Sequence, residues 1–441
     1  MLPALQYSAL GFETFREEVL WPAVTALRVP AEAAVWHPKG HPPLAEAKRA
    51  SFRPIDVGYR WGPVWSTAWF RVRATLPAVP SGCELALRFS SGTEATLWLD
   101  GRPFQGFDPY RDLAFAWKGK RPQRGTKAEF LIEAACNLPL GISTFWWDHP
   151  ELHARWKEAA PGRLESCELV AVDPTLWRFV QRWDFLRKVL LTQPPESARA
   201  MRINDAMRDI ARAIDRRDPA AGMRHQAAAL TSAIEGAEGE RGGTTCVAVG
   251  HAHIDTAWLW PIRETRRKCL RTFASVVRLI DRFPDFHFIC SQAQQYAWVE
   301  EDAPELFAEI RERVRKGRFE PTGAMWIEPD ATCPSGESFI RQILHGTRYW
   351  SERFGAASRQ RMLYLPDTFG FPPCLPQIAR LAGIDTFITN KMSWCESNRF
   401  PHVTFRWRGL DGTEILTHLT PGHNYNSAIE PADFAWLFAS A

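Results

Sequence analysis

The sequence has no apolar stretch long enough to cross a lipid bilayer, which argues against an integral membrane protein. Residues 1–5 lack the basic start and apolar core of a secretory signal peptide. The nine cysteines are an odd number without paired spacing, so the sequence does not indicate a disulfide framework. Together these absences favour a cytoplasmic protein whose thiols stay free in a reducing compartment.

A strong charge of either sign is also missing. The net charge is +4 at pH 7, and the basic clusters at 263–268 and 311–316 fit the solvated faces of helices. This excludes the concentrated basic surface expected of a nucleic-acid-binding protein. What remains is a globular composition, with 45% hydrophobic and 24% charged residues, and 441 residues are enough for two or three domains.

The first part of the chain, which we place at residues 1–165, shows the alternation of apolar and polar residues that is typical of half-buried strands. The alternating segments are 68–76, 85–89, 95–99 and 130–132. Asp100 and Gly101 mark a tight turn between two strands. Several short strands with turn signals predict an antiparallel β-sandwich, a fold that often binds sugars without settling the function.

Residues 166–240 are predicted to form a helical connector. Asp173 followed by Pro174 is a favourable helix start, because the carboxylate can cap the first turn and proline suits the first helical position. Further helices fit 201–214 and 219–235, and the glycine-rich stretch 236–243 is typical of a flexible linker.

From residue 241 to 441 the pattern changes to alternating strands and helices, which predicts a parallel sheet or barrel. The predicted strands are 246–249, 286–290, 319–326, 362–365 and 386–388. Residues 431–438 look like the beginning of a helix, so we expect the chain to stop within a domain. The predicted fold is a multidomain α+β protein: a β-sandwich, a helical connector and a partial parallel β/α barrel.

The most informative motif surrounds two polar residues at the end of the predicted strand 246–249. His253 and Asp255 are two positions apart, so on an extended backbone their side chains point to the same side. In parallel α/β folds ligands bind at this end of the strands, and nitrogen and oxygen ligands suit zinc or a similar divalent ion. The alternative is two polar residues that end a strand and meet water or an arginine. Trp258, just downstream, offers a flat apolar face for a sugar ring.

A second carboxylate follows another predicted strand. Asp367 comes directly after 362–365 and before a Gly-Phe-Pro turn, so it should face the same open end as the first motif. It is a candidate metal ligand, nucleophile or both, whereas a helix N-cap is the alternative.

Two further strand ends carry weaker candidates. Glu328 fits a site rim as well as it fits a solvated loop. Lys391 could pair with a carboxylate nucleophile or hold a substrate hydroxyl, although a surface lysine is nearly as good an interpretation. His402, His418 and His423 are weaker candidates still.

The order of these motifs resembles glycoside hydrolase family 38. The resemblance rests on Gly-His-Ala-His-Ile-Asp-Thr-Ala-Trp-Leu-Trp-Pro, then Trp-Ile-Glu-Pro-Asp with Pro-Ser-Gly-Glu-Ser, then Leu-Pro-Asp-Thr-Phe-Gly-Phe, then Asn-Lys-Met-Ser-Trp with Phe-Pro-His. It covers about 244–427 and is strongest to the cytosolic and bacterial α-mannosidases. Segments 58–63 and 65–69 also resemble the leading domain of that group.

The resemblance implies a retaining α-mannosidase with a divalent metal in its site, usually Zn²⁺ and in some cytosolic members Co²⁺. By position in the motifs, His253 and Asp255 would be the first two ligands. Asp367 would be the third ligand and also the nucleophile that forms a covalent mannosyl-enzyme intermediate.

The resemblance also implies the contacts of the sugar. Trp258 would lie beneath the ring, Phe369 would border the pocket, and Lys391 would lie close to the nucleophile, while Glu328 is a candidate contact at the rim. The expected partner is a terminal α-mannoside of an oligosaccharide. Related enzymes are often oligomers, so a homo-oligomer is possible.

The family has a further histidine ligand and an aspartate general acid downstream, and neither motif occurs before Ala441. We therefore expect weak metal binding and little turnover unless a second polypeptide completes the barrel. One alternative is a catalytically incomplete carbohydrate-binding or interaction protein. Another, a metal-dependent polysaccharide deacetylase, needs an Asp-Asp pair and a His-x-x-x-His spacing that are missing here.

Overall fold

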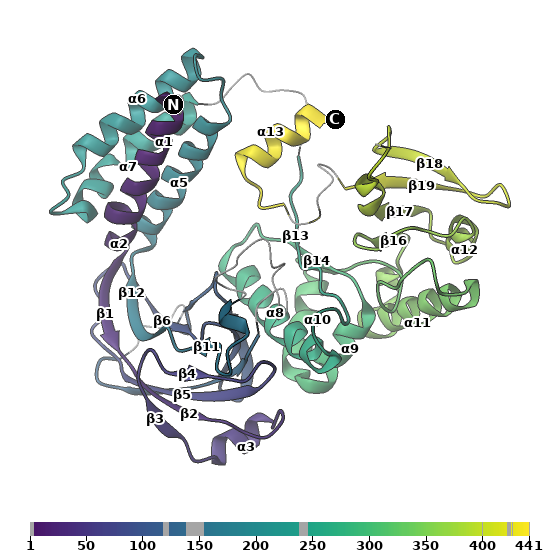
Figure 1. Ribbon diagram of the computed structural model, residues 1–441, viewed down its shortest axis with the longest axis horizontal. Helices are drawn as coiled ribbons and strands as arrows, with labels where there is room; N and C mark the ends of the chain where they lie inside the picture. Colours follow the sequence, from purple (N-terminus) through teal and green to yellow (C-terminus); the bar gives the residue numbers. More distant parts are fainter. Residues whose placement is uncertain are drawn as a thin grey trace.

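The computed structural model describes residues 4–117, 123–137, 154–237, 246–398, 400–420, 425 and 427–440. Figure 1 shows three parts: a β-rich part, a helical part above it, and an α/β part beside them. The predicted multidomain α+β architecture is therefore confirmed.

The β-rich part consists of antiparallel sheets with a shared core. One sheet has the order β3-β2-β5-β10-β7-β8, a second has the order β1-β12-β6-β9, and β11 pairs with β4. The strands are β1 (Thr25–Pro30), β2 (Glu32–Trp36), β3 (Arg53–Ile55), β4 (Arg60–Trp61), β5 (Thr67–Thr75), β6 (Glu84–Ser90), β7 (Glu94–Leu99), β8 (Arg102–Phe107), β9 (Leu113–Ala114), β10 (Lys127–Ala135), β11 (Gly162–Arg163) and β12 (Ser166–Val172), and helix α3 (Leu44–Arg49) precedes β3.

Alternation along the strands explains why the two larger sheets pack together. Phe70 on β5 and Leu97 on β7 point from the six-stranded sheet into the same buried cluster as Phe89 on β6 of the other sheet. The turn between β7 and β8 places Asp100 at φ 52° and Gly101 at φ 85°, a backbone conformation that glycine and aspartate tolerate. The predicted sandwich and its tight turn are confirmed.

The helical part also contains the first described residues, which corrects the prediction that the whole segment 1–165 is β. Its helices are α1 (Ala4–Phe15), the π-helical η1 (Arg16–Leu20), α2 (Trp21–Ala23), α5 (Pro174–Leu191), α6 (Ala198–Ala213) and α7 (Pro219–Gly236). Phe12 and Phe15, spaced as one face of a helix, each place their ring centroid 5.6 Å from Trp183 on α5. Residues 238–243 of the predicted linker lie outside the described residues.

Asp173 caps α5 as the sequence predicts. Its carboxylate accepts hydrogen bonds from the N–H groups of Thr175 at 2.8 Å and Leu176 at 3.2 Å, and Arg224 donates to it at 2.6 Å. Burial opposes the charge, but these donors outweigh burial and hold the pKa of Asp173 below its usual range.

We expect Asp173→Ala to lower the free energy of unfolding by about 1–2 kcal/mol, because two helix N–H groups lose their acceptor. Asp173→Asn should cost less, since the amide oxygen can still cap. Because the pKa of Asp173 is lower in the folded state than in the unfolded state, its carboxylate stabilises the fold above the ordinary aspartate range, and this stabilisation is lost as the pH falls. The free energies of unfolding of wild type and the asparagine variant should therefore converge below about pH 4. Urea unfolding at several pH values measures this, with the exposed Asp209→Ala as control. Equal effects of the two alanine variants would contradict the assignment.

The α/β part contains two sheets of mainly parallel strands. One has the order β13-β14-β15 and is parallel, whereas the other has the order β16-β17-β19-β18 with β18 antiparallel at its edge. Its elements are β13 (Gly250–His251), α8 (Ile262–Arg282), β14 (Phe288–Cys290), α9 (Ala293–Asp302), α10 (Pro304–Arg315), β15 (Phe319–Pro321), α11 (Gly336–Phe354), η2 (Ala356–Ser358), β16 (Met362–Leu365), α12 (Leu375–Leu381), β17 (Thr386–Thr389), η3 (Lys391–Trp394), β18 (Thr404–Arg408), β19 (Glu414–Leu419) and α13 (Pro431–Ser440). This arrangement is the expected partial β/α barrel.

The predicted strand at 246–249 is wrong. Pairing of β13 with β14 begins only at Gly250, and the apolar residues before it are exposed, Val247 by 86% and Val249 by 42%. A β-branched sequence becomes a strand only beside a partner, and β14 offers one from Phe288 onward. The strand predicted at 319–326 is also shorter in the structure, where β15 ends at Pro321.

The sandwich and the α/β part meet along one side of α8. Glu94 on β7 accepts from Lys268 at 2.7 Å and from Arg271 at 2.5 Å, and all three side chains are almost fully buried. The N–H of Gly106 on β8 donates to the Ser275 hydroxyl at 2.9 Å. A Cβ at Gly106 would lie 3.1 Å from the Arg271 carbonyl oxygen, so glycine permits this close approach.

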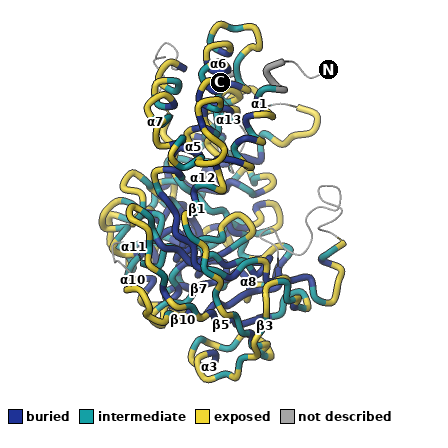
Figure 2. Tube along the Cα trace, turned by 90° about the vertical axis from the view of Figure 1, so that its left-hand side faces the viewer, coloured by how far each residue is buried: buried dark blue, intermediate teal, exposed yellow. Residues whose placement is uncertain are grey.

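Burial follows this layering. Figure 2 shows the strands of the sandwich largely buried and the outer surfaces of α6 and α7 exposed.

All nine cysteines are unpaired. A search of the described residues finds no helix with the length and apolar character needed to cross a membrane.

Candidate active site

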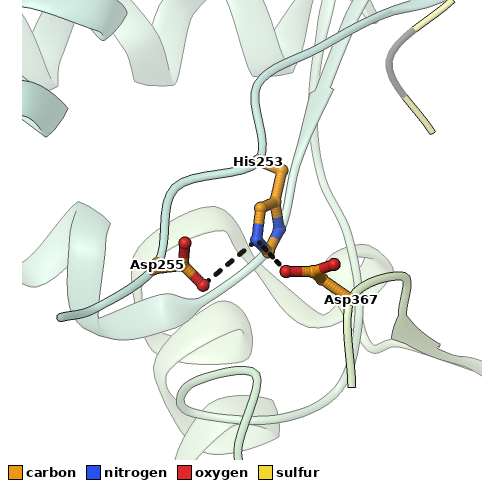
Figure 3. A group of neighbouring side chains, drawn as sticks. All are labelled: His253, Asp255 and Asp367. Carbon is orange, nitrogen blue, oxygen red and sulfur yellow. Dashed lines mark hydrogen bonds and ion pairs between the residues drawn. The ribbon is translucent and has the colours of Figure 1, made fainter. Parts of the chain in front are cut away.

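Three polar side chains from two separate segments meet at the carboxyl ends of the strands. His253 and Asp255 lie in the loop after β13, and Asp367 lies just after β16. Figure 3 shows the two carboxylates on either side of the His253 ring, both directed at one nitrogen. From Nε2 of His253 the distance is 3.3 Å to Oδ1 of Asp255 and 3.4 Å to Oδ2 of Asp367. The structure thus brings together the three predicted metal ligands.

The spacing of these atoms fits a divalent cation. The three possible ligand atoms all lie within 4.8 Å of one another. Ligands held about 2.0–2.2 Å from a tetrahedral ion are about 3.4 Å apart, which matches the two distances from His253. One imidazole with two carboxylates is also a ligand set that zinc and similar ions accept.

Glu328 occupies a different place from the one expected. Instead of facing the rim, its side chain is only 6% exposed, and its Oε2 lies 3.0 Å from Nδ1 of His253, the nitrogen that points away from the metal group. The Ser291 hydroxyl donates to the other carboxylate oxygen, and the Glu328 N–H donates to the Gln292 side chain at 3.2 Å. A carboxylate on the far nitrogen of a metal-binding histidine fixes the orientation of the ring.

The charges around His253 favour a cation. Burial disfavours protonation of the ring, but Asp255, Asp367 and Glu328 outweigh burial and raise the pKa of His253 to about 12. With His253 neutral, these three carboxylates and the ammonium of Lys391 give the group a formal charge of −2. One divalent cation would cancel that charge.

Asp367 is held by two donors in addition to His253. Lys391, whose side chain is 3% exposed, places Nζ 2.6 Å from Oδ1 of Asp367, and the Tyr425 hydroxyl donates to the same oxygen at 2.6 Å. Burial opposes the charge, but His253, Lys391 and Tyr425 outweigh it and hold the pKa of Asp367 well below its usual range. Lys391 therefore pairs with the carboxylate, which was one of its two predicted roles.

Sequence reasoning missed Tyr425. It lies outside the described helices and strands, 58 positions after Asp367 along the chain, and no spacing rule links it to that aspartate. The Tyr425 and His253 rings lie 5.4 Å apart.

Exposed aromatic rings surround the lysine. Phe369 and Trp394 are 64% and 59% exposed, and their centroids lie 6.1 Å apart. The Lys391 ammonium lies 3.2 Å from the Trp394 ring and 4.5 Å from the Phe369 ring. Trp258, three residues after Asp255, is 47% exposed and contacts Trp260 edge-on. Exposed rings beside polar groups suit the apolar faces of sugars.

Among the described residues, no other histidine belongs to the three-residue group. His251 packs edge-on against Tyr364, and burial, followed by the neighbouring His253, lowers its pKa to about 4. His418 on β19 contacts the Thr404 hydroxyl at 2.8 Å, His402 is exposed, and His423 lies outside the described residues.

The position of Glu328 gives a test by metal binding alone. We expect Glu328→Ala to weaken the affinity for Zn²⁺ or Co²⁺ about 10–100-fold, because the His253 ring loses the group that orients it. Calorimetric titration and the visible absorption of bound Co²⁺ measure the change. Glu337→Ala is the matched control, because Glu337 is 62% exposed and pairs with the nearby Arg341. Similar affinities in both variants would contradict the orienting role.

Comparisons with known proteins point to one family. Residues 243–439 match the glycosyl hydrolases family 38 N-terminal domain, and residues 29–160 match the alpha-mannosidase jelly roll domain. The chain is 36% identical over 385 residues to human Alpha-mannosidase 2C1, covering 87% of this chain and 36% of that protein. It is 32% identical over 419 residues to Alpha-mannosidase of Saccharomyces cerevisiae, covering 85% and 35%.

Among solved structures, an alpha-mannosidase from Enterococcus faecalis V583 aligns with a TM-score of 0.36 and 24% identity, over 44% of this chain and 22% of that one. The chain spans about a third of the length of the curated relatives it matches.

Proposed function

We propose that this chain, whose residues 243–439 match the glycosyl hydrolases family 38 N-terminal domain, supplies the nucleophile and metal ligands of a retaining α-mannosidase. The substrate would be a terminal α-mannoside of an oligosaccharide. The observation that supports this most directly is the position of Asp367, a carboxylate directed at His253 and held by Lys391 and Tyr425.

His253, Asp255 and Asp367 would hold the metal, Zn²⁺ or Co²⁺. When bound, the ion would supply a Lewis acid that binds sugar hydroxyls. Catalytic metal sites commonly use three protein ligands and leave a position for substrate, which is the number these residues provide.

In the proposed reaction an Asp367 oxygen attacks the anomeric carbon, a C–O bond forms to the sugar, and the glycosidic C–O bond breaks. The leaving oxygen takes a proton from a general acid, and water then releases mannose and restores the carboxylate. Lys391 and Tyr425 keep Asp367 ionised before attack. Among the described residues we assign no general acid, because Asp255 and Glu328 both face His253.

Phe369 and Trp258 would form apolar walls for the sugar ring. We assign residues 25–172 to the sandwich, because β12 pairs with β1 and β6, and residues 4–23 with 173–240 to the helical connector. Residues 241–441 are assigned to the catalytic barrel. A cytoplasmic location is in keeping with the nine unpaired cysteines.

The test uses a sugar with an activated leaving group, so that no general acid is needed. The chain is incubated with Zn²⁺ or Co²⁺ and a 5-fluoro-α-mannosyl fluoride, and the labelled peptide is identified by mass spectrometry. We expect a covalent adduct on Asp367 that depends on the metal. The matching glucosyl fluoride should label much less.

An adduct on another residue would overturn the proposal. Sugar binding without any adduct would instead favour the catalytically incomplete carbohydrate-binding protein.

A further inference from the structure

A second concave region, the junction cavity, lies where the three parts of the molecule meet. Its volume is about 1190 Å³. Its walls are the β7–β8 turn and residues 110–116 of the sandwich, Trp21 with the start of α5, and residues 275–283 at the end of α8. Because a helix rises 1.5 Å per residue, this end lies roughly 20 Å along α8 from the end that follows Trp258.

Exposed aromatic rings gather at this cavity. Trp21, Tyr110 and Phe283 line it and are exposed by 37%, 93% and 50%. The wall continues inward through Trp177, whose centroid is 5.2 Å from Trp21, and Phe115, which lies 6.5 Å from Trp177. Exposed apolar rings that gather in one region of a protein surface mark an interaction site more often than single ones do.

The local backbone turns the most exposed of these rings outward. Asp108 and Arg111 exchange backbone hydrogen bonds of 3.1 and 3.0 Å, which makes a tight two-residue turn. The Asp108 carboxylate also accepts from the Tyr110 N–H at 2.8 Å. The position of Tyr110 is therefore fixed by its own turn without burial of the ring.

The charged side chains of the cavity are mostly paired. The pairs are Arg28 with Glu168 at 3.0 Å, Arg88 with Asp112 at 3.2 Å, Arg102 with Glu309 at 3.3 Å, Arg282 with Glu84 at 2.9 Å, and Arg278 with Glu309. The Arg282 guanidinium also lies 3.9 Å above the Phe115 ring. The lining holds seven arginines and four carboxylates, and the partners Glu84 and Glu168 reduce the net charge to +1. Donors and acceptors thus lie side by side with little net charge, which suits hydroxyl groups better than an anion.

We propose that the junction cavity is a second, non-catalytic carbohydrate site that takes a neutral oligosaccharide. Its rings would stack on the apolar faces of the sugars, and its arginine–carboxylate pairs would bind their hydroxyls. The cavity exceeds the roughly 300–1,000 Å³ of ordinary small-molecule pockets, so it has room for several sugar rings. The choice of sugar as the ligand rests on the proposed function, whereas the location and chemistry of the site do not.

The test is calorimetric titration of a linear α-linked mannopentaose into the 441-residue chain carrying Asp255→Ala and Asp367→Ala, which impairs the metal group. We expect binding to persist there. Adding Tyr110→Ala and Phe283→Ala should weaken it about tenfold, because two stacking rings are lost. Phe185→Ala on α5 is the matched control, since Phe185 is 47% exposed and lies outside the cavity lining. In the otherwise wild-type chain, Tyr110→Ala should leave labelling of Asp367 unchanged.

Three results would overturn this inference: no binding to the chain with the impaired metal group, equal binding with and without the two rings, or tighter binding of mannose 6-phosphate than of the neutral sugar. Altered sedimentation of the Tyr110→Ala, Phe283→Ala chain with unchanged sugar affinity would point to a second copy of the chain as the occupant. A failure of the proposed function would give a different result: the Asp367 adduct would be missing, while oligosaccharide binding at the junction cavity would persist.

Discussion

Asp367→Asn should slow formation of the mannosyl adduct by a factor on the order of 10⁴ or more, because an amide cannot replace an ionised carboxylate as the nucleophile. The substitution keeps the size of the side chain, so Lys391 and Tyr425 lose a charged partner but no cavity forms beside them. The rate is measured from the labelled fraction at several times after adding the fluorosugar.

Asp385→Asn is the matched control for this prediction. Asp385 directly precedes β17 and pairs with Arg361, so it lies at the opposite end of the same sheet. It should leave the labelling rate within about twofold of wild type, since surface pairs contribute little. Comparable losses in both variants would show that the sheet, and not the nucleophile, had been damaged.

Glu94→Ala should lower the free energy of unfolding by about 3–5 kcal/mol, because it removes a buried carboxylate that pairs with two buried cations. Lys268 and Arg271 are 7% and 5% exposed, and both pair with this carboxylate. Burial alone already lowers the pKa of Lys268, and Glu94 opposes that effect. Urea unfolding followed by tryptophan fluorescence measures the loss, and hydrogen exchange in α8 shows whether this contact opens first.

Two controls separate the buried charge from general damage. Replacing Glu94, Lys268 and Arg271 together by methionine should recover most of the stability, because the carboxylate and both of its cations are then removed together. Glu414→Ala, which breaks the exposed pair with Arg408, should cost less than about 1 kcal/mol. If the triple variant were as unstable as Glu94→Ala, the packing of the side chains and not their charge would determine the stability of this contact.

The candidate ligands were predictable because strand direction makes distant segments converge. His253, Asp255 and Asp367 each follow a strand or an extended segment of a parallel sheet, and the carboxyl ends of such strands meet on one side. The rule needs only the order of the strands, so the wrong prediction of a strand at 246–249 did not affect it.

Glu328, Tyr425 and Lys391 show where that rule stops. Glu328 also follows a strand, yet it lies behind His253, because Ser291 and Gln292 from the neighbouring segment hold it there. Tyr425 reaches Asp367 from a segment without a repeating pattern. For Lys391, local sequence left open whether it meets a carboxylate or a sugar.

By itself the sequence determined the three structural parts, the sandwich alternation, the cap at Asp173 and the identity of the metal-ligand candidates, because each depends on local spacing along the chain. Only the tertiary structure decided three other features: the helical conformation of residues 4–23, the buried contact of Glu94 with α8, and the junction cavity. Each depends on which surfaces meet after the chain has folded, and a residue's neighbours in space are not encoded in its neighbours in sequence.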